Sequence, residues 1–113
     1  MEKAIWLSYD LGIGGDYDHL YEWLDNHNAI ECGDSVAFFK MDFPKNATDE
    51  EIIEKLKKEI KENINIEPKR SRIYCIRRDT EGCTIRGSFL FGSRKGNPWD
   101  GYGSKNTQDD IDG

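Results

Sequence analysis

The sequence has no long hydrophobic run, since none approaches the roughly 18 consecutive apolar residues that a membrane span needs. This excludes an integral membrane protein of the helical kind. The first residues, Met1 to Trp6, resemble the start of a strand, without the charged and apolar regions of a signal peptide. The sequence therefore predicts a cytoplasmic protein with no membrane partner.

Cysteine and histidine are also scarce. Three cysteines are an odd number, and their spacing fits no metal site, which is typical of reduced thiols in a cytoplasm. Only two histidines are present, and nothing ties either of them to a cysteine as a catalytic pair would require. With 113 residues, of which 36% are hydrophobic, the chain has enough apolar surface for one domain and one core.

Positive charge is rare in the first two thirds of the chain and concentrated afterwards, although the net charge is -6. Residues 1–68 hold 7 Lys/Arg against 16 Asp/Glu, whereas residues 69–95 hold 8 Lys/Arg against 2 Asp/Glu. The basic segment can form an anion-binding face on an acidic body. Alternatively, it neutralises the acidic helices within one fold or across a dimer.

Residue periodicity predicts an alternating order of strands and helices. Strands are expected over residues 4–11 and 72–77, and residues 30–43 form one kinked strand or a short hairpin. Asp16 is the expected N-cap of a first helix, and Thr48 with Glu51 forms a capping box for a second. The second helix carries one apolar stripe, in which Ile53, Leu56 and Ile60 are expected core residues.

The end of the chain is predicted to add a strand and a tail. Residues 79–82 form a turn, residues 83–91 pair back as a hairpin strand, and residues 104–113 are an acidic, disordered tail. The predicted fold is therefore an α+β, ferredoxin-like two-layer sandwich over residues 1–103, with two helices on one face of an antiparallel sheet. The other face carries Trp6 and further aromatic residues, which favours burial in a homodimer.

The glycine-rich stretch 92–103 is the most unusual part of the sequence. Its two cations and two aromatic residues can hold a phosphate and stack a base. Alternatively, Trp99 and Tyr102 fold back over an edge of the core. Strand alternation predicts that Arg86 points away from the core. The predicted nucleic-acid-binding residues are Arg77, Arg86, Arg94, Lys95, Trp99 and Tyr102.

Four segments together resemble a known family. They are the apolar strand ending at Asp10, the Asp34-Ser35-Val36-Ala37-Phe38-Phe39 run, the Thr-capped helix, and Ser71-Arg72-Ile73-Tyr74-Cys75-Ile76. In this order, from Ala4 to Arg78, they resemble the small CRISPR-associated ferredoxin-like nucleases of the spacer-adaptation complex and their relatives, the VapD-type toxin ribonucleases of toxin–antitoxin systems.

The resemblance implies a homodimeric, metal-dependent endonuclease. In that family the aspartate that ends the first strand meets its symmetry mate, and the pair holds Mg²⁺ or Mn²⁺. Asp10 is the residue that matches, and it would be both the catalytic and the metal-binding residue. The alternative is that the Asp10 carboxylate accepts amide protons of the loop formed by residues 12–15.

Three functions follow as hypotheses. The first is a nucleic-acid-associated, nuclease-like protein of a defence system or mobile element, catalytic or not. The second is an acidic, non-catalytic regulator or inhibitor that binds a protein by imitating the charge of nucleic acid. The third is a binder of a small nucleotide through the basic hairpin and the Trp99 loop.

Overall fold

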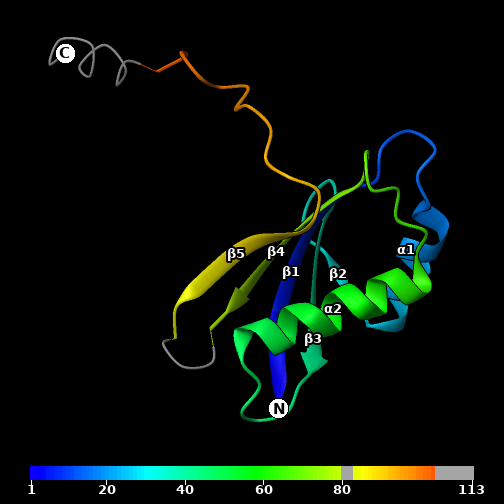
Figure 1. Cartoon of the computed structure of the whole chain (residues 1–113), viewed down its shortest axis with the longest axis vertical. Coiled ribbons are helices and arrows are strands. Elements are labelled where there is room, and N and C mark those ends of the chain that lie inside the picture. Colours follow the sequence, from blue (N-terminus) through cyan, green and yellow to red (C-terminus); the bar gives the residue numbers. More distant parts are fainter. Residues whose placement is uncertain (80–82, 104–113) are drawn as a thin grey trace, which may run out of the picture.

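A computed structural model describes residues 1–79 and 83–103. The predicted turn residues 80–82 and the predicted tail 104–113 lie outside this description. The described chain forms seven elements (Figure 1): β1 (Glu2–Asp10), α1 (Tyr17–Asn26), β2 (Ile30–Glu31), β3 (Val36–Asp42), α2 (Asp49–Asn63), β4 (Arg72–Arg78) and β5 (Ile85–Phe91). In this part of the chain, no helix is long and apolar enough to cross a membrane.

The strands form one sheet in the order β2-β3-β1-β4-β5, and all neighbouring strands are antiparallel. β1 lies in the centre, where Leu7 is opposite Ala37 of β3 on one side and Cys75 of β4 on the other. The predicted α+β class, with an antiparallel sheet and two helices, is confirmed. The segment expected as a kinked strand or a short hairpin is the hairpin of β2 and β3.

Both helices begin where the sequence predicts. Asp16 caps α1 by accepting from the backbone of His19, and Thr48 and Glu51 form the expected capping box at the start of α2. Such caps satisfy backbone N–H groups that the first turn of a helix leaves without partners. Leu56 and Ile60 of α2 are fully buried, as predicted, whereas Ile53 is only partly buried against the core.

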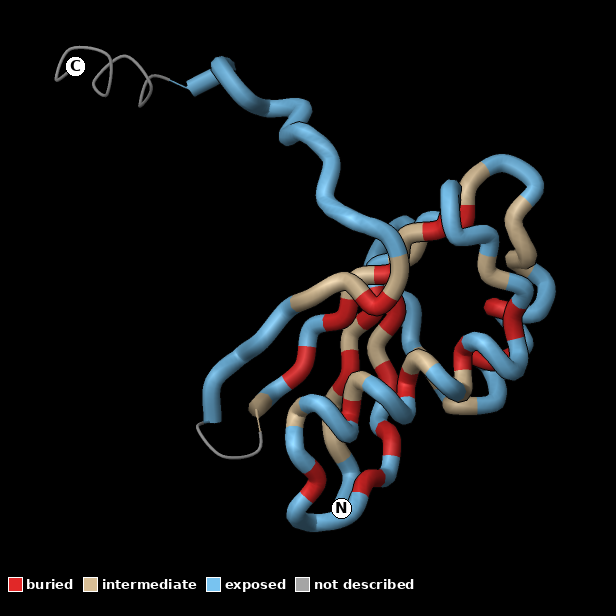
Figure 2. Tube along the Cα trace, in the orientation of Figure 1, coloured by how far each residue is buried: buried red, intermediate tan, exposed pale blue. Residues whose placement is uncertain are grey.

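One face of the sheet packs against both helices. Because successive strand residues point to opposite faces, Ile5 and Leu7 of β1 are buried in this core, whereas Trp6 and Ser8 point to the other side. Figure 2 shows this alternation as short buried segments along the strands. The opposite face, called the uncovered face below, carries Trp6 against Phe38, with ring centroids 4.8 Å apart. An aromatic uncovered face agrees with the prediction from the sequence.

The alternation predicted for the last strand is wrong, because a β-bulge interrupts its pairing. Ile73 is opposite Phe91 but Tyr74 is opposite Phe89, so Leu90 is an extra residue on β5. The side chains before the bulge therefore face the other way from those predicted by simple alternation. Phe89 shares the uncovered face with Tyr74, and Arg86 shares the helix-covered face with Arg77.

Candidate nucleic-acid interface

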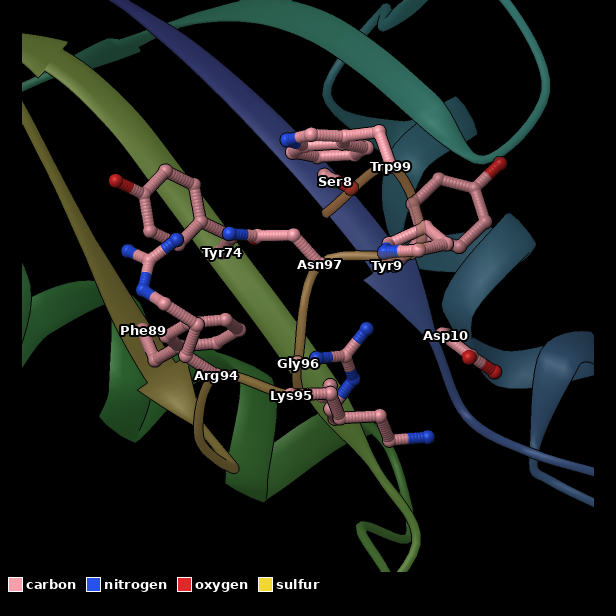
Figure 3. A pocket seen from close by; sticks show the side chains of 12 residues that line it. Ser8, Tyr9, Asp10, Tyr74, Phe89, Arg94, Lys95, Gly96, Asn97 and Trp99 are labelled. Carbon is pink, nitrogen blue, oxygen red and sulfur yellow. The ribbon is translucent and has the colours of Figure 1, made fainter. Parts of the chain in front are cut away.

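A pocket of about 390 Å³ lies on the uncovered face, between the sheet and the segment that follows β5. This segment, residues 92–99, is called the strap below, because it passes back over β4 towards β1 (Figure 3). Ser8 and Tyr74 line the sheet side of the pocket, and Asn97 and Trp99 line the strap side. The pocket thus combines the centre of the sheet with the stretch that the sequence marks as unusual.

Aromatic rings form much of the pocket wall. Tyr74 and Phe89 pack edge to face, with centroids 4.9 Å apart. Gly87 makes this position of Tyr74 possible, because a Cβ at residue 87 would collide with the Tyr74 ring. Trp99 is 66% exposed, and no aromatic ring of the described residues contacts it. The pocket therefore offers an aromatic surface that is open to a ligand.

Three cations line the pocket, and two of them lie against these rings. The Arg94 guanidinium lies 5.7 Å from the Tyr74 centroid and 5.6 Å from that of Phe89, and Arg72 lies 5.7 Å from Phe89. Lys95 is the third cation of the pocket. None of the ion pairs among residues 1–79 and 83–103 involves any of the three. Their charge is available to an anionic ligand.

Arg72 has an additional unused donor. Its Nη1 donates to the carbonyl of Ser93, 3.2 Å away, which ties the strap to β4. Its Nε is buried, and no acceptor within the described chain lies at hydrogen-bonding distance. A buried charged donor without a partner costs free energy.

A second hollow, of about 380 Å³, continues from the first around the end of the sheet. The two share Asp10, Arg72 and Lys95, and the second adds Lys69 and Arg70. Five cations and one carboxylate therefore line the two hollows together. This concentration of positive charge contrasts with the net charge of -6 for the whole chain.

Asp10, the predicted metal ligand, lies at the edge of both hollows. Its Oδ1 accepts the backbone N–H of Gly12 at 3.0 Å, as the alternative interpretation predicted. Among the described residues, no three His, Cys, Asp or Glu side chains are grouped as a metal site would require. Arg72 is the cross-strand partner of Asp10, and Lys95 lines the same hollows. Within one chain, these residues do not fit a divalent cation.

Arg77 and Arg86, predicted to bind nucleic acid, lie outside the pocket on the helix-covered face. Arg77 is 5% exposed, donates to both carboxylate oxygens of Asp49 at 2.7 and 2.9 Å, and donates to the Ser88 hydroxyl. The guanidinium of Arg77 holds the pKa of Asp49 below its ordinary value. Arg86 pairs with Asp79 at 2.8 Å. Arg77 thus joins α2 to the sheet and is not free to contact a phosphate.

The remaining predicted residues are on the strap or beyond it. Arg94, Lys95 and Trp99 line the pocket, whereas Tyr102 does not and is 88% exposed. Neither aromatic side chain covers an edge of the core, so that alternative is wrong. Sequence reasoning missed Arg72, Tyr74 and Phe89. Alternation within residues 72–77 would have placed Arg72 and Tyr74 together, but the bulge concealed Phe89.

Comparisons with protein-family models, with curated proteins and with solved structures find no match to this chain. The site must therefore be interpreted from its own geometry and charge.

Proposed function

We propose that this protein binds nucleic acid in the pocket between the uncovered face and the strap. The observation that carries the proposal is the set of three cations, Arg72, Arg94 and Lys95, which have no acidic partner in the described chain and line one pocket together with aromatic residues. Cations bind the phosphates of a nucleic acid, and aromatic rings stack with its bases.

The strand order supports the ferredoxin-like arrangement. The order β1-α1-β2-β3-α2-β4, with a sheet arranged β2-β3-β1-β4, agrees with the split βαβ pattern, and β5 adds one edge strand. The four-stranded sheet of the RNA-recognition module places aromatic side chains on its uncovered face, where they stack unpaired bases. Trp6, Phe38, Tyr74 and Phe89 lie on the corresponding face here. This likeness of architecture adds support but does not by itself establish the function.

The distribution of charge also supports the proposal. An acidic protein is repelled by nucleic acid over most of its surface, so binding must be confined to the basic end of the sheet. Each phosphate neutralised there releases counterions, and the affinity then falls as salt rises. If the protein instead binds another protein by imitating the charge of nucleic acid, Arg94 and Lys95 should not produce a salt-dependent affinity for nucleic acid.

The proposal is tested by measuring the affinity for a labelled oligonucleotide at several salt concentrations. We expect Arg94→Gln with Lys95→Gln to weaken binding and to flatten the salt dependence by about two units of slope. The matched control is Lys45→Gln with Lys58→Gln, which removes two exposed cations away from the pocket and should change neither quantity. Absence of binding at low salt, or equal effects of the two double variants, would contradict the proposal.

Metal-dependent cleavage is a separate prediction, which follows from the family resemblance alone. It requires that Asp10 of a second copy complete a site that one chain does not provide. Asp10→Asn should leave oligonucleotide binding intact and abolish any cleavage that depends on Mg²⁺ or Mn²⁺. Cleavage that persists in this variant would exclude Asp10 as the catalytic residue.

A further inference from the structure

The pocket is small, and both aromatic and cationic residues line it. We infer, on the basis of the proposed function, that it holds a single unpaired nucleotide, so that the protein prefers single-stranded nucleic acid to a duplex. The base lies against Trp99 and the Tyr74–Arg94 wall, and the neighbouring phosphate lies towards Arg72 and Lys95. The inference rests on the size of the pocket, on the difference between its Trp99 end and its Lys95 end, and on the position of Trp99.

The size of the pocket limits what can enter it. A volume of about 390 Å³ lies in the lower part of the range of small-molecule sites, roughly 300–1,000 Å³. This suits one base with its sugar, whereas a base pair stacked between its neighbours is too large. The strap closes one side of the pocket, and therefore a duplex cannot lie flat on the aromatic rings beneath it.

The two ends of the pocket differ in character, although the guanidinium groups of Arg72 and Arg94 lie within 5.7 Å of aromatic ring centroids. Figure 3 shows Trp99 and Tyr74 on one side, with the Asn97 side chain between them, and Lys95 towards Asp10 on the other side. A nucleotide also has two different ends, a flat base at one and a charged phosphate at the other. Arg72 also lines the pocket and supplies a further positive charge.

Trp99 explains why the base must be unpaired. Its indole is largely exposed and has no ring partner in the described chain, although it lines the pocket. Stacking needs the open face of a base, which is accessible in a single strand and hidden in a duplex. The Arg94 guanidinium, already stacked near Tyr74 and Phe89, offers a second flat surface for the same base.

The test compares a labelled single-stranded oligonucleotide of ten nucleotides with a hairpin oligonucleotide in which the same sequence is paired. At low salt we expect the single strand to bind at least about tenfold more tightly, because only it allows base stacking. Trp99→Ala should remove most of this preference, weakening single-strand binding about tenfold and leaving hairpin binding unchanged. Trp99→Phe should restore part of the loss. Circular dichroism checks that each variant is folded.

Tyr102→Ala is the matched control, because Tyr102 is also an exposed aromatic residue near Trp99 in the sequence, but it does not line the pocket. It should have no effect. Equal binding of single strand and hairpin, or an equal loss in the Tyr102 and Trp99 variants, would overturn this inference while the proposed function stands. If neither oligonucleotide binds at low salt, the proposed function itself fails.

Discussion

Leu56 illustrates how single apolar residues hold the helices to the sheet. It is completely buried on α2, within the core that also contains Ile5, Leu7 and Phe39. Leu56→Ala should lower the free energy of unfolding by about 2–5 kcal/mol, because it removes buried contacts and leaves a cavity. Ile53→Ala, at a partly buried position one turn earlier, should cost less. Urea denaturation of both variants checks this, and a loss below about 1 kcal/mol at Leu56 would mean that α2 does not dock as described.

The Arg77–Asp49 pair is the strongest polar link between α2 and the sheet. Asp49→Asn leaves the buried guanidinium of Arg77 without its anion, and should cost about 2–3 kcal/mol, less than for a fully buried pair because the Asp49 side chain is 24% exposed. Glu50→Gln is the matched control, since it removes a neighbouring carboxylate in the first turn of α2. Equal stabilities of the two variants would contradict the structural role given to Arg77.

The same pair predicts how stability depends on pH. Arg77 lowers the pKa of Asp49 below its ordinary value of 3.8, because its hydrogen bonds favour the ionised carboxylate. The contribution of the pair is therefore present above pH 3.8 and is lost as the pH falls through the lowered pKa. Asp16, whose pKa is also lowered, chiefly by a hydrogen bond from the Asn65 amide, adds to the same trend. Acid titration of the Asp49→Asn protein should show a weaker loss of stability than that of the parent.

At the level of elements, the turn at Gly92 decides where the strap runs. Gly92 has φ of 78°, and an added Cβ would lie 2.7 Å from the Ser71 carbonyl oxygen. Gly92→Ala should therefore destabilise the protein by more than about 1 kcal/mol. Gly96→Ala is the control, because a Cβ there meets nothing within 4 Å, and should change stability by less than about 0.5 kcal/mol. Thermal denaturation distinguishes them, and a neutral Gly92 variant would contradict the described turn.

The elements differ in how well the sequence predicts them. The capping residues Asp16 and Thr48 and the apolar stripe of α2 act locally, and therefore both helices were predicted from the residues alone. The faces of β5 were not predicted, since the bulge at Leu90 depends on how two strands pair. Arg77 was assigned to the binding site because periodicity does not reveal its ion pair with Asp49, a residue far away in the sequence.

The candidate site was only partly predictable for a similar reason. Composition drew attention to Arg94, Lys95 and Trp99, because cations and an aromatic residue are unusual in a glycine-rich stretch. Arg72 and Tyr74 came from an ordinary strand pattern, and only the path of the strap over the sheet gives them a shared pocket with Trp99. Residue periodicity describes each segment separately, and therefore it does not show which distant segments meet in the fold.

At the scale of the whole molecule, the half of the uncovered face away from the pocket is apolar. Trp6 and Phe38 lie there beside Ile30, which is 60% exposed on the edge strand β2. Apolar surface of this kind favours association, and a homodimer is the assembly that the family resemblance implies. We expect light scattering at micromolar concentration to give twice the 13.1 kDa of one chain.

Ile30→Asp should shift such a dimer towards monomers. Ile13→Asp is the matched control, because Ile13 is an equally apolar, exposed residue in the loop after β1, away from this half of the face. A monomeric parent protein would exclude the dimer. It would also remove the metal site shared between two Asp10 carboxylates, but it would leave the pocket and its proposed ligand unaffected.

The most direct test of the account is to locate the nucleic acid on the protein. Two-dimensional ¹H–¹⁵N spectra would be recorded at low salt during titration with a short single-stranded oligonucleotide. We predict that the amide shifts concentrate at Ser8, Tyr74, Phe89 and the strap residues 92–99, with little change along α2. Shifts confined to the helices, or no shifts at saturating oligonucleotide, would contradict the claim that the uncovered face and the strap form a nucleic-acid-binding site.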